Sequence, residues 1–262
     1  MRVLTTIVAL AAFACALTIA IAGPGAKMGW WDYGTGFSMM RKVASPIDII
    51  EGSISLSPIF VLAGLSLLGG LAALVMRPRG LGVFAILAAF AAVAAGMVPI
   101  KMRDLATSNP FIHDITTDFD NPPPIIAGAD EDRVNPPEYV GDELVRNTDM
   151  TVAQAQREAF PELGPKTVNA SLDETAEIVR NLIPSMNMVI LDETLTDEGW
   201  LIEAAYTSFW YGFVDDFVVR LSPEGSQTRV DVRSKSRVGG SDLGANAKRV
   251  QEFFDKLDAV AP

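Results

Sequence analysis

Three long apolar runs constrain this chain more than any other feature of its sequence. They cover residues 3–22, 54–76 and 81–100, and none of them contains a charged residue. Because an α-helix rises about 1.5 Å per residue, about 20 apolar residues are enough to cross the hydrocarbon core of a bilayer. The runs therefore predict three transmembrane helices in an integral membrane protein. Only residues 77–80 separate the second run from the third, which predicts a tight helical hairpin.

The segment between the first two runs, residues 23–53, combines aromatic and basic residues. These are Trp30, Trp31, Tyr33, Phe37, Arg41 and Lys42. Such side chains beside a membrane span suit the headgroup region, so we expect an interfacial belt. A lid over a ligand is the alternative interpretation.

Charge divides the chain into two parts. Residues 1–103 carry eight Lys or Arg against three Asp or Glu, whereas residues 104–262 carry 13 against 29. An acidic part of this kind argues against nucleic acid as a partner, since phosphate neutralisation needs a basic face. The predicted organisation is a membrane domain over 1–103, a Pro- and Asp-rich extended segment over 104–150 and a soluble α+β domain over 151–262.

Basic residues flank the apolar runs on both sides, so two orientations compete. One side carries Arg2, Arg77 and Arg79, and the other carries Lys27, Arg41, Lys42, Lys101 and Arg103. The count favours the second side as cytoplasmic. A Met-Arg start before an apolar run is instead typical of a signal sequence or signal anchor. The signal pattern gives the same orientation whether or not the first apolar run is cleaved. We therefore expect an inner (plasma) membrane protein whose C-terminal domain faces the periplasm or the outside.

Hydrophobic periodicity after residue 150 predicts an α+β fold. Helices are expected over 151–160, 171–184 and 243–257, and strands over 166–170, 188–195, 200–207, 213–221 and 228–236. A further short strand is expected within 111–118. The turns at 197–199 and 223–225 have hairpin length, which predicts an antiparallel sheet. The two longer helices are amphipathic, so we expect both to cover one face of it.

Several motifs follow one another through the acidic part. They read His-Asp-Ile-Thr-Thr-Asp (113–118), Gln-Arg-Glu-Ala-Phe-Pro (156–161), Ile-Glu-Ala (202–204), Gly-Phe-Val-Asp-Asp-Phe-Val-Val-Arg (212–220), Val-Asp-Val-Arg-Ser-Lys-Ser-Arg-Val-Gly (230–239) and Ser-Asp-Leu-Gly-Ala-Asn-Ala-Lys-Arg (241–249). Over about residues 109–258 this order resembles the uncharacterised family known as domain of unknown function 1499. One departure is Met186-Asn187-Met188, where the family tends to have Gly-Trp. That position is expected to pack in the core. The resemblance implies a domain and a location, and no reaction.

Period-2 alternation gathers charged residues on two of the predicted strands. Asp216 and Arg220 share one face of the strand over 213–221, and Asp231 and Arg233 share one face of the next strand. Ordinary cross-strand ion pairing is one interpretation of this lattice. A polar surface that binds a ligand is the other.

The glycine loop at 238–242 leads directly into the last predicted helix. Free N–H groups at a helix N-terminus favour an anion, and Arg237 and Arg249 would add positive charge. Alternatively, Ser241 or Asp242 simply caps the helix. The residues expected to bind a ligand are Asp216, Arg220, Arg233, Arg237, Ser241, Asp242, Asn246 and Arg249.

The single histidine, His113, stands among Asp114, Asp118 and Asp120. Such a group suggests a metal site or a general base, but a docking strand is the simpler interpretation. Cys15, the single cysteine, allows no disulfide within the chain. We assign no catalytic residue, no metal site and no cofactor.

These patterns together predict a membrane-anchored domain outside the cytoplasm, which binds an anionic ligand, a lipid or a protein partner at the membrane surface. Expected partners are the lipid bilayer and either an anionic small molecule or a membrane protein, with no nucleic acid. One alternative is a hydrolase-like enzyme that uses His113 and a nearby carboxylate. Another is a structural subunit of a membrane complex.

Overall fold

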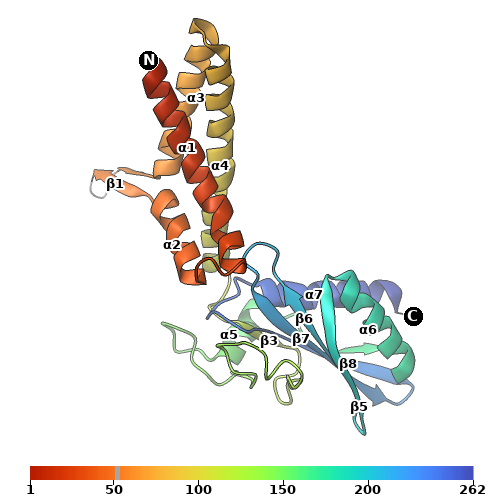
Figure 1. Cartoon of the computed structure of the whole chain (residues 1–262). Coiled ribbons are helices and arrows are strands. Elements are labelled where there is room, and N and C mark those ends of the chain that lie inside the picture. The colour runs from red at the N-terminus through yellow and green to blue at the C-terminus, as the bar shows by residue number, and fades with distance from the viewer. Residues whose placement is uncertain (51–53, 262) are drawn as a thin grey trace. The chain divides into compact units, whose positions relative to one another are not determined.

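The computed structural model describes residues 1–50 and 54–261, and the chain in it forms two compact units (Figure 1). The first unit consists of Met1–Asp104 together with Phe209–Gly212. The second consists of Leu105–Ser208 and Phe213–Pro262.

The first unit contains three helices that are long and apolar enough to cross a membrane, as predicted. They are α1 (Arg2–Lys27), α3 (Pro58–Met76) and α4 (Arg79–Ser108). Small residues allow close packing between them. The buried Ser66 hydroxyl donates to the Ala85 carbonyl at 2.8 Å, and a Cβ added to Gly70 would lie 3.0 Å from the Gly82 carbonyl oxygen.

Two features of the first unit were not predicted. One is the helix α2 (Tyr33–Ala44), which begins after Asp32, whose carboxylate accepts from the Thr35 N–H at 2.9 Å. The other is a hairpin of β1 (Ile47–Ile50) and β2 (Ile54–Leu56). The predicted span over 54–76 is therefore shorter, because α3 begins at Pro58. Proline is favoured at a helix start, since its missing N–H would have no partner there.

The second unit is built on a six-stranded sheet with the order β3-β8-β7-β6-β5, in which β4 also pairs with β8. All of its strand pairs are antiparallel. The strands are β3 (Asp114–Thr116), β4 (Lys166–Val168), β5 (Met188–Thr196), β6 (Gly199–Thr207), β7 (Val214–Glu224) and β8 (Gln227–Ser236). Every strand predicted for this unit is present.

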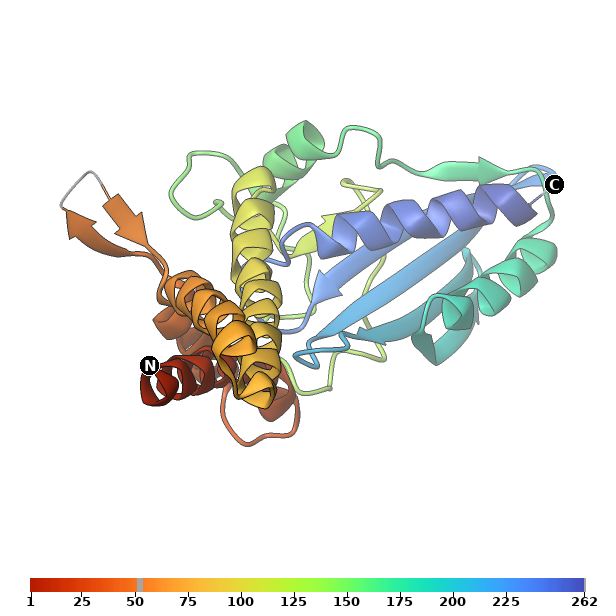
Figure 2. The same cartoon turned by 90° about the horizontal axis from the view of Figure 1, so that it is seen from above.

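The helices of the second unit are α5 (Val152–Ala159), α6 (Leu172–Ser185) and α7 (Ala245–Val260). The views in Figures 1 and 2 show α6 and α7 along one face of the sheet. Both α5 and α6 begin with a capping box, through Thr151 and Ser171. The α+β fold and the two covering helices are thus as predicted.

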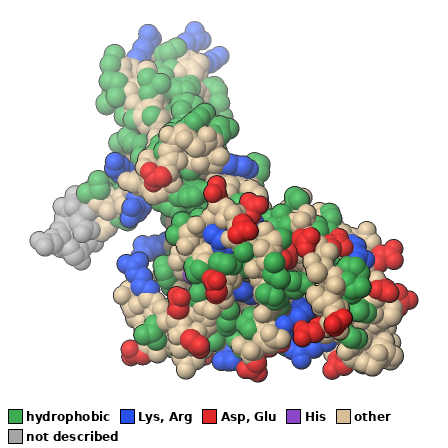
Figure 3. All heavy atoms as spheres, turned by 60° about the horizontal axis from the view of Figure 1, so that its bottom comes forward, with side chains coloured by type: hydrophobic (Ala, Val, Ile, Leu, Met, Phe, Trp, Pro, Cys, Tyr) green, Lys and Arg blue, Asp and Glu red, His purple; other side chains and the backbone are tan. Residues whose placement is uncertain are grey.

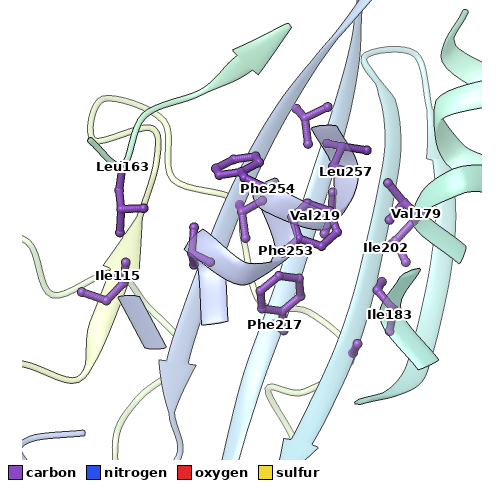
Figure 4. Packing of buried hydrophobic residues seen from close by; sticks show 14 of the residues in the cluster. Ile115, Leu163, Val179, Ile183, Ile202, Phe217, Val219, Phe253, Phe254 and Leu257 are labelled. Carbon is purple, nitrogen blue, oxygen red and sulfur yellow. The ribbon is translucent and has the colours of Figure 1, made fainter. Parts of the chain in front are cut away.

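The main core lies between the sheet and these helices (Figure 4). Phe217 of β7 meets Phe253 of α7 edge to face, with ring centroids 5.3 Å apart. Met186 and Met188 are buried in the same core, as expected for the position that departs from the family pattern.

The opposite face of the sheet is covered by irregular chain. Ile125 packs against Leu201 and Val218, and the Glu203 carboxylate accepts from the backbone N–H groups of Ile126 and Ala127 at 2.9 Å each. The segment over 104–150 was expected to lie along the surface, but it also contributes side chains to the main core. These are Ile112, Ile115, Val140 and Val145.

Candidate functional site

The charged residues predicted on β7 and β8 do share one face of the sheet. The strand register sets Asp216 opposite Lys235, and Arg220 opposite Asp231. Because side chains alternate along a strand, these four point away from the core residues between them. This face is the one over which residues 117–140 pass, and most of the charged side chains on it are buried.

Asp114 of β3 is the centre of the first ion-pair group. The Arg233 guanidinium donates through Nε to Oδ1 and through Nη2 to Oδ2, both at 2.9 Å. Lys235 Nζ lies 3.1 Å from Oδ2. Arg233 is 2% exposed and Lys235 is fully buried. Burial lowers the pKa of the Lys235 ammonium, although Asp114 opposes this effect.

Asp216 is the centre of the second group. Its Oδ2 accepts from Arg133 Nη1 at 2.9 Å, and its Oδ1 lies 2.7 Å from Arg237 Nη2. Arg237 also reaches the Glu131 carboxylate at 3.4 Å. Arg133 belongs to the covering segment, so these contacts fix that segment to the sheet.

The third group surrounds Arg220. Its Nη2 donates to Asp118 at 2.9 Å and to Asp231 at 3.1 Å, and Arg229 contacts the same two carboxylates. Burial raises the pKa of Asp118. Hydrogen bonds from the N–H groups of Asn121 and Asp120, with the two arginines, outweigh burial and lower that pKa overall.

The start of α7 holds the fourth group. Asp242 accepts from the N–H groups of Gly244 at 2.9 Å and Asn246 at 2.8 Å, and so caps the helix entrance. Burial raises the pKa of its carboxyl group to about 6. Ser241 Oγ accepts from the Leu243 N–H at 3.3 Å. Of the two predicted caps, only Asp242 therefore accepts from an N–H group of α7, while Ser241 contacts the loop before it and Gly244 stands at the N-cap position.

Two more motif residues extend the fourth group into the sheet. Asn246 Nδ2 donates to the Ser236 hydroxyl at 3.0 Å, and its Oδ1 accepts from Ser234 at 2.7 Å. Arg249 donates to the same Oδ1 at 2.6 Å and to the Asp215 carboxylate at 2.8 Å. The two residues thus tie α7 to β7 and β8.

His113 lies next to the first group. Burial lowers the pKa of its imidazole, and the nearby Lys235 ammonium lowers it further. Within the described ranges, its buried Nε2 has no hydrogen-bond partner. The neighbouring carboxylate of Asp114 is already held by Arg233 and Lys235. Among the described residues, no group of three or more His, Cys, Asp or Glu is placed to hold a metal ion.

The predicted ligand-binding residues are therefore distributed over all four groups, and each charged one contacts partners of its own. Those partners were not included in the prediction: Asp114, Asp118, Glu131, Arg133, Asp215 and Arg229. The signal that could have found several of them is the family motif, since Asp114, Asp118 and Asp215 stand within the motifs quoted above. Ligand binding by the predicted set stays a prediction.

A different surface lies at the open edge of the sheet. Strand β5 pairs with β6 alone, and no strand in the described part of the chain pairs with its other edge. Three of its apolar side chains are exposed: Val189 (68%), Leu191 (39%) and Leu195 (58%). Leu191 lies at a register shift between Ile190 and Asp192. We call this strand and its side chains the β5 edge.

A comparison with protein-family profiles shows the family to which the chain belongs. The profile of the family described as protein of unknown function (DUF1499) matches residues 114–257, which is more than half of the chain. This chain belongs to the DUF1499 family. No curated protein and no solved structure matches the chain. In this DUF1499 protein, the motif over 230–249 supplies Arg233, Arg237, Asp242 and Arg249 to the buried groups described above.

Proposed function

We propose that this DUF1499 protein is a membrane-anchored binding module, without catalytic activity, whose second unit faces the periplasm or the outside. Its ligand is an extended segment of a protein partner, which adds to the sheet along the β5 edge. The observation that carries this proposal is the open, partly apolar β5 edge. Unpaired backbone N–H and C=O groups along a strand are satisfied best by another strand.

The charges near the β5 edge favour a basic partner segment. Asp192 lies in the middle of the strand, and Asp197 and Glu198 occupy the turn that follows, whereas Glu193 is already paired with Arg180 of α6. Figure 3 shows acidic side chains spread over the visible face of the same unit. Lys or Arg on the incoming strand would therefore be attracted, and binding would weaken at high salt.

The same charges argue against a second copy of this chain as the occupant. Two antiparallel β5 strands centred on Asp192 would place the two Asp192 side chains opposite each other. Like charges directly opposite across strands are destabilising. A basic segment from a different protein avoids this repulsion.

An anionic ligand has less support than a protein partner. Arg220, Arg233, Arg237 and Arg249 each contact at least one carboxylate within the domain. An anion would have to compete with these buried carboxylates for the same guanidinium groups.

The test uses the full chain in lipid nanodiscs and a synthetic peptide of alternating Val and Lys. We expect this peptide to bind, and a Val-Glu peptide of equal length not to bind. Asp192→Lys should weaken the Val-Lys complex by about tenfold or more, because it replaces an attraction by a repulsion. Leu144→Lys also introduces a lysine, at an exposed residue outside β5, and serves as the control.

Two results would contradict the proposal. One is equal binding of both peptides. The other is equal loss of affinity in Asp192→Lys and Leu144→Lys, since a diffuse charge effect would then explain the binding. Isotope-edited infrared spectra of the bound peptide should also show strand structure, as addition to a sheet requires.

A further inference from the structure

The loop between β6 and β7 carries three consecutive aromatic residues, Phe209, Trp210 and Tyr211, followed by Gly212. Gly212 has a φ of 73°, a conformation that glycine adopts without a Cβ penalty. Although the loop is about 100 residues beyond α4 in the sequence, residues 209–212 belong to the first, apolar unit. The sequence alone did not indicate a role for this loop.

Trp210 packs on the C-terminal part of α1. Its indole Nε1 donates to the Ala20 carbonyl at 3.2 Å. A Cβ added to Gly23 would lie 2.8 Å from the indole ring, so glycine gives the ring its room. One turn further on, Lys27 Nζ donates to the Phe209 carbonyl at 3.2 Å. The loop is thus held at the end of a helix that is apolar enough to cross a membrane.

Tyr211 packs on α2, which carries Tyr33 and Phe37 of the aromatic residues predicted to lie in the headgroup region. Its ring stacks on Phe37, with centroids 4.8 Å apart and planes 18° from parallel. Its hydroxyl lies 3.7 Å from the Met40 sulfur. Trp210 and Tyr211 therefore fix the loop within the aromatic set of the first unit.

Phe209 differs from its neighbours because its side chain is 89% exposed. A large apolar ring left uncovered beside a half-buried Trp210 and a buried Tyr211 is unfavourable in water. Trp210 also borders an apolar groove of about 450 Å³, whose other walls are α1 and α4, including Phe13, Leu17 and Val98. Both helices are long and apolar enough to cross a membrane.

We propose that residues 209–212 form an interfacial anchor, with the Phe209 ring in contact with bilayer lipid at the boundary between headgroups and acyl chains. Aromatic residues concentrate at this depth, and a basic residue such as Lys27 reaches the phosphate level from the same place. The partner of this surface is therefore a phospholipid. The proposal does not depend on the β5 edge.

The test is a depth measurement on the full chain in nanodiscs that contain only phospholipid. Cys15→Ser removes the single cysteine, and Phe209→Cys then takes a nitroxide label. Because Phe209 is almost fully exposed, this change removes little packing. Val189→Cys, at an exposed apolar residue of β5, is the matched control.

We expect the ratio of oxygen to nickel-chelate collision rates to be several-fold higher at position 209 than at position 189, since oxygen concentrates in lipid and the chelate in water. Equal ratios at the two positions would overturn the proposal. Phe209→Asp provides a second measurement without a label. Brominated phospholipid should quench tryptophan fluorescence less in this variant than in Phe209→Leu, and equal quenching would count against the anchor.

Discussion

At the residue scale, the second unit stands out for the ionised side chains that it buries. Asp114, Lys235 and Arg233 lie under the covering segment with almost no exposure. Burying a charge costs several kcal/mol, and a pair regains this only with good geometry and further hydrogen bonds. Arg233 meets this demand through two bonds to Asp114 and one to the Pro137 carbonyl. We expect these buried ion pairs to hold the covering segment in one position on the sheet.

Removal of one partner should therefore be costly. Asp114→Asn keeps the size of the side chain but leaves Arg233 and Lys235 buried without their countercharge. We expect a loss of about 3–5 kcal/mol in the free energy of unfolding. Hydrogen exchange of core amides in the full chain would measure it. The control is Glu252→Gln, which breaks an exposed pair with Lys256 at 3.9 Å and should cost less than about 1 kcal/mol.

The Asp242 carboxyl group should make stability depend on pH. Its pKa is about 6 in the folded chain, above an ordinary value of 3.8. The unfolded state therefore ionises first, and this group's contribution to stability is present below about pH 4 and is lost as pH rises through 6. Asp242→Asn removes the titration. The variant should gain free energy of unfolding relative to the original chain between pH 4 and 7, and a constant difference would contradict the assignment.

The sequence predicted which residues share the charged face, but not what each one contacts. Alternation along β7 and β8 is local and follows from strand geometry. The contact of Asp114 with Arg233 joins residues 119 positions apart. It depends on where an irregular, proline-containing segment passes over the sheet. No local pattern encodes that path, so the predicted surface is buried instead of open.

At the scale of single elements, capping residues made the helices of the second unit predictable. Ser171 accepts from the Glu174 N–H, and the Glu174 carboxylate accepts from the Ser171 N–H. In contrast, α2 was missed because its sequence is short and rich in glycine and aromatic residues. Its start depends on the Asp32 cap and its packing on α1, which the periodicity of the segment does not reveal.

The capping box at the start of α6 is expected to contribute measurably to stability. Ser171→Ala removes the side-chain acceptor for one free N–H group and should cost about 1 kcal/mol. Asn181→Ala, at an exposed position of the same helix, replaces a weaker helix former by a stronger one and should not reduce stability. Hydrogen exchange of the α6 amides would compare the two. Equal stability of both variants would show that the cap contributes nothing.

At the scale of the whole molecule, the chain joins an apolar, helical unit to an acidic α+β unit of the DUF1499 family. The apolar runs alone predicted the three long helices, because length and lack of charge are sufficient for that inference. The side of the membrane on which the second unit lies has to be inferred from weaker sequence signals. Basic residues flank both ends of the spans, so charge counting and the signal-anchor pattern give opposite orientations.

The measurement that tests the central claim most directly is the orientation of the second unit in spheroplasts. In a Cys15→Ser chain, Asp197→Cys places a thiol in the exposed turn after β5, and Gly80→Cys places one at the start of α4. We predict that a membrane-impermeant maleimide labels position 197 in intact spheroplasts, and position 80 only after lysis. The reverse pattern would place the β5 edge in the cytoplasm and contradict the proposed binding role outside it.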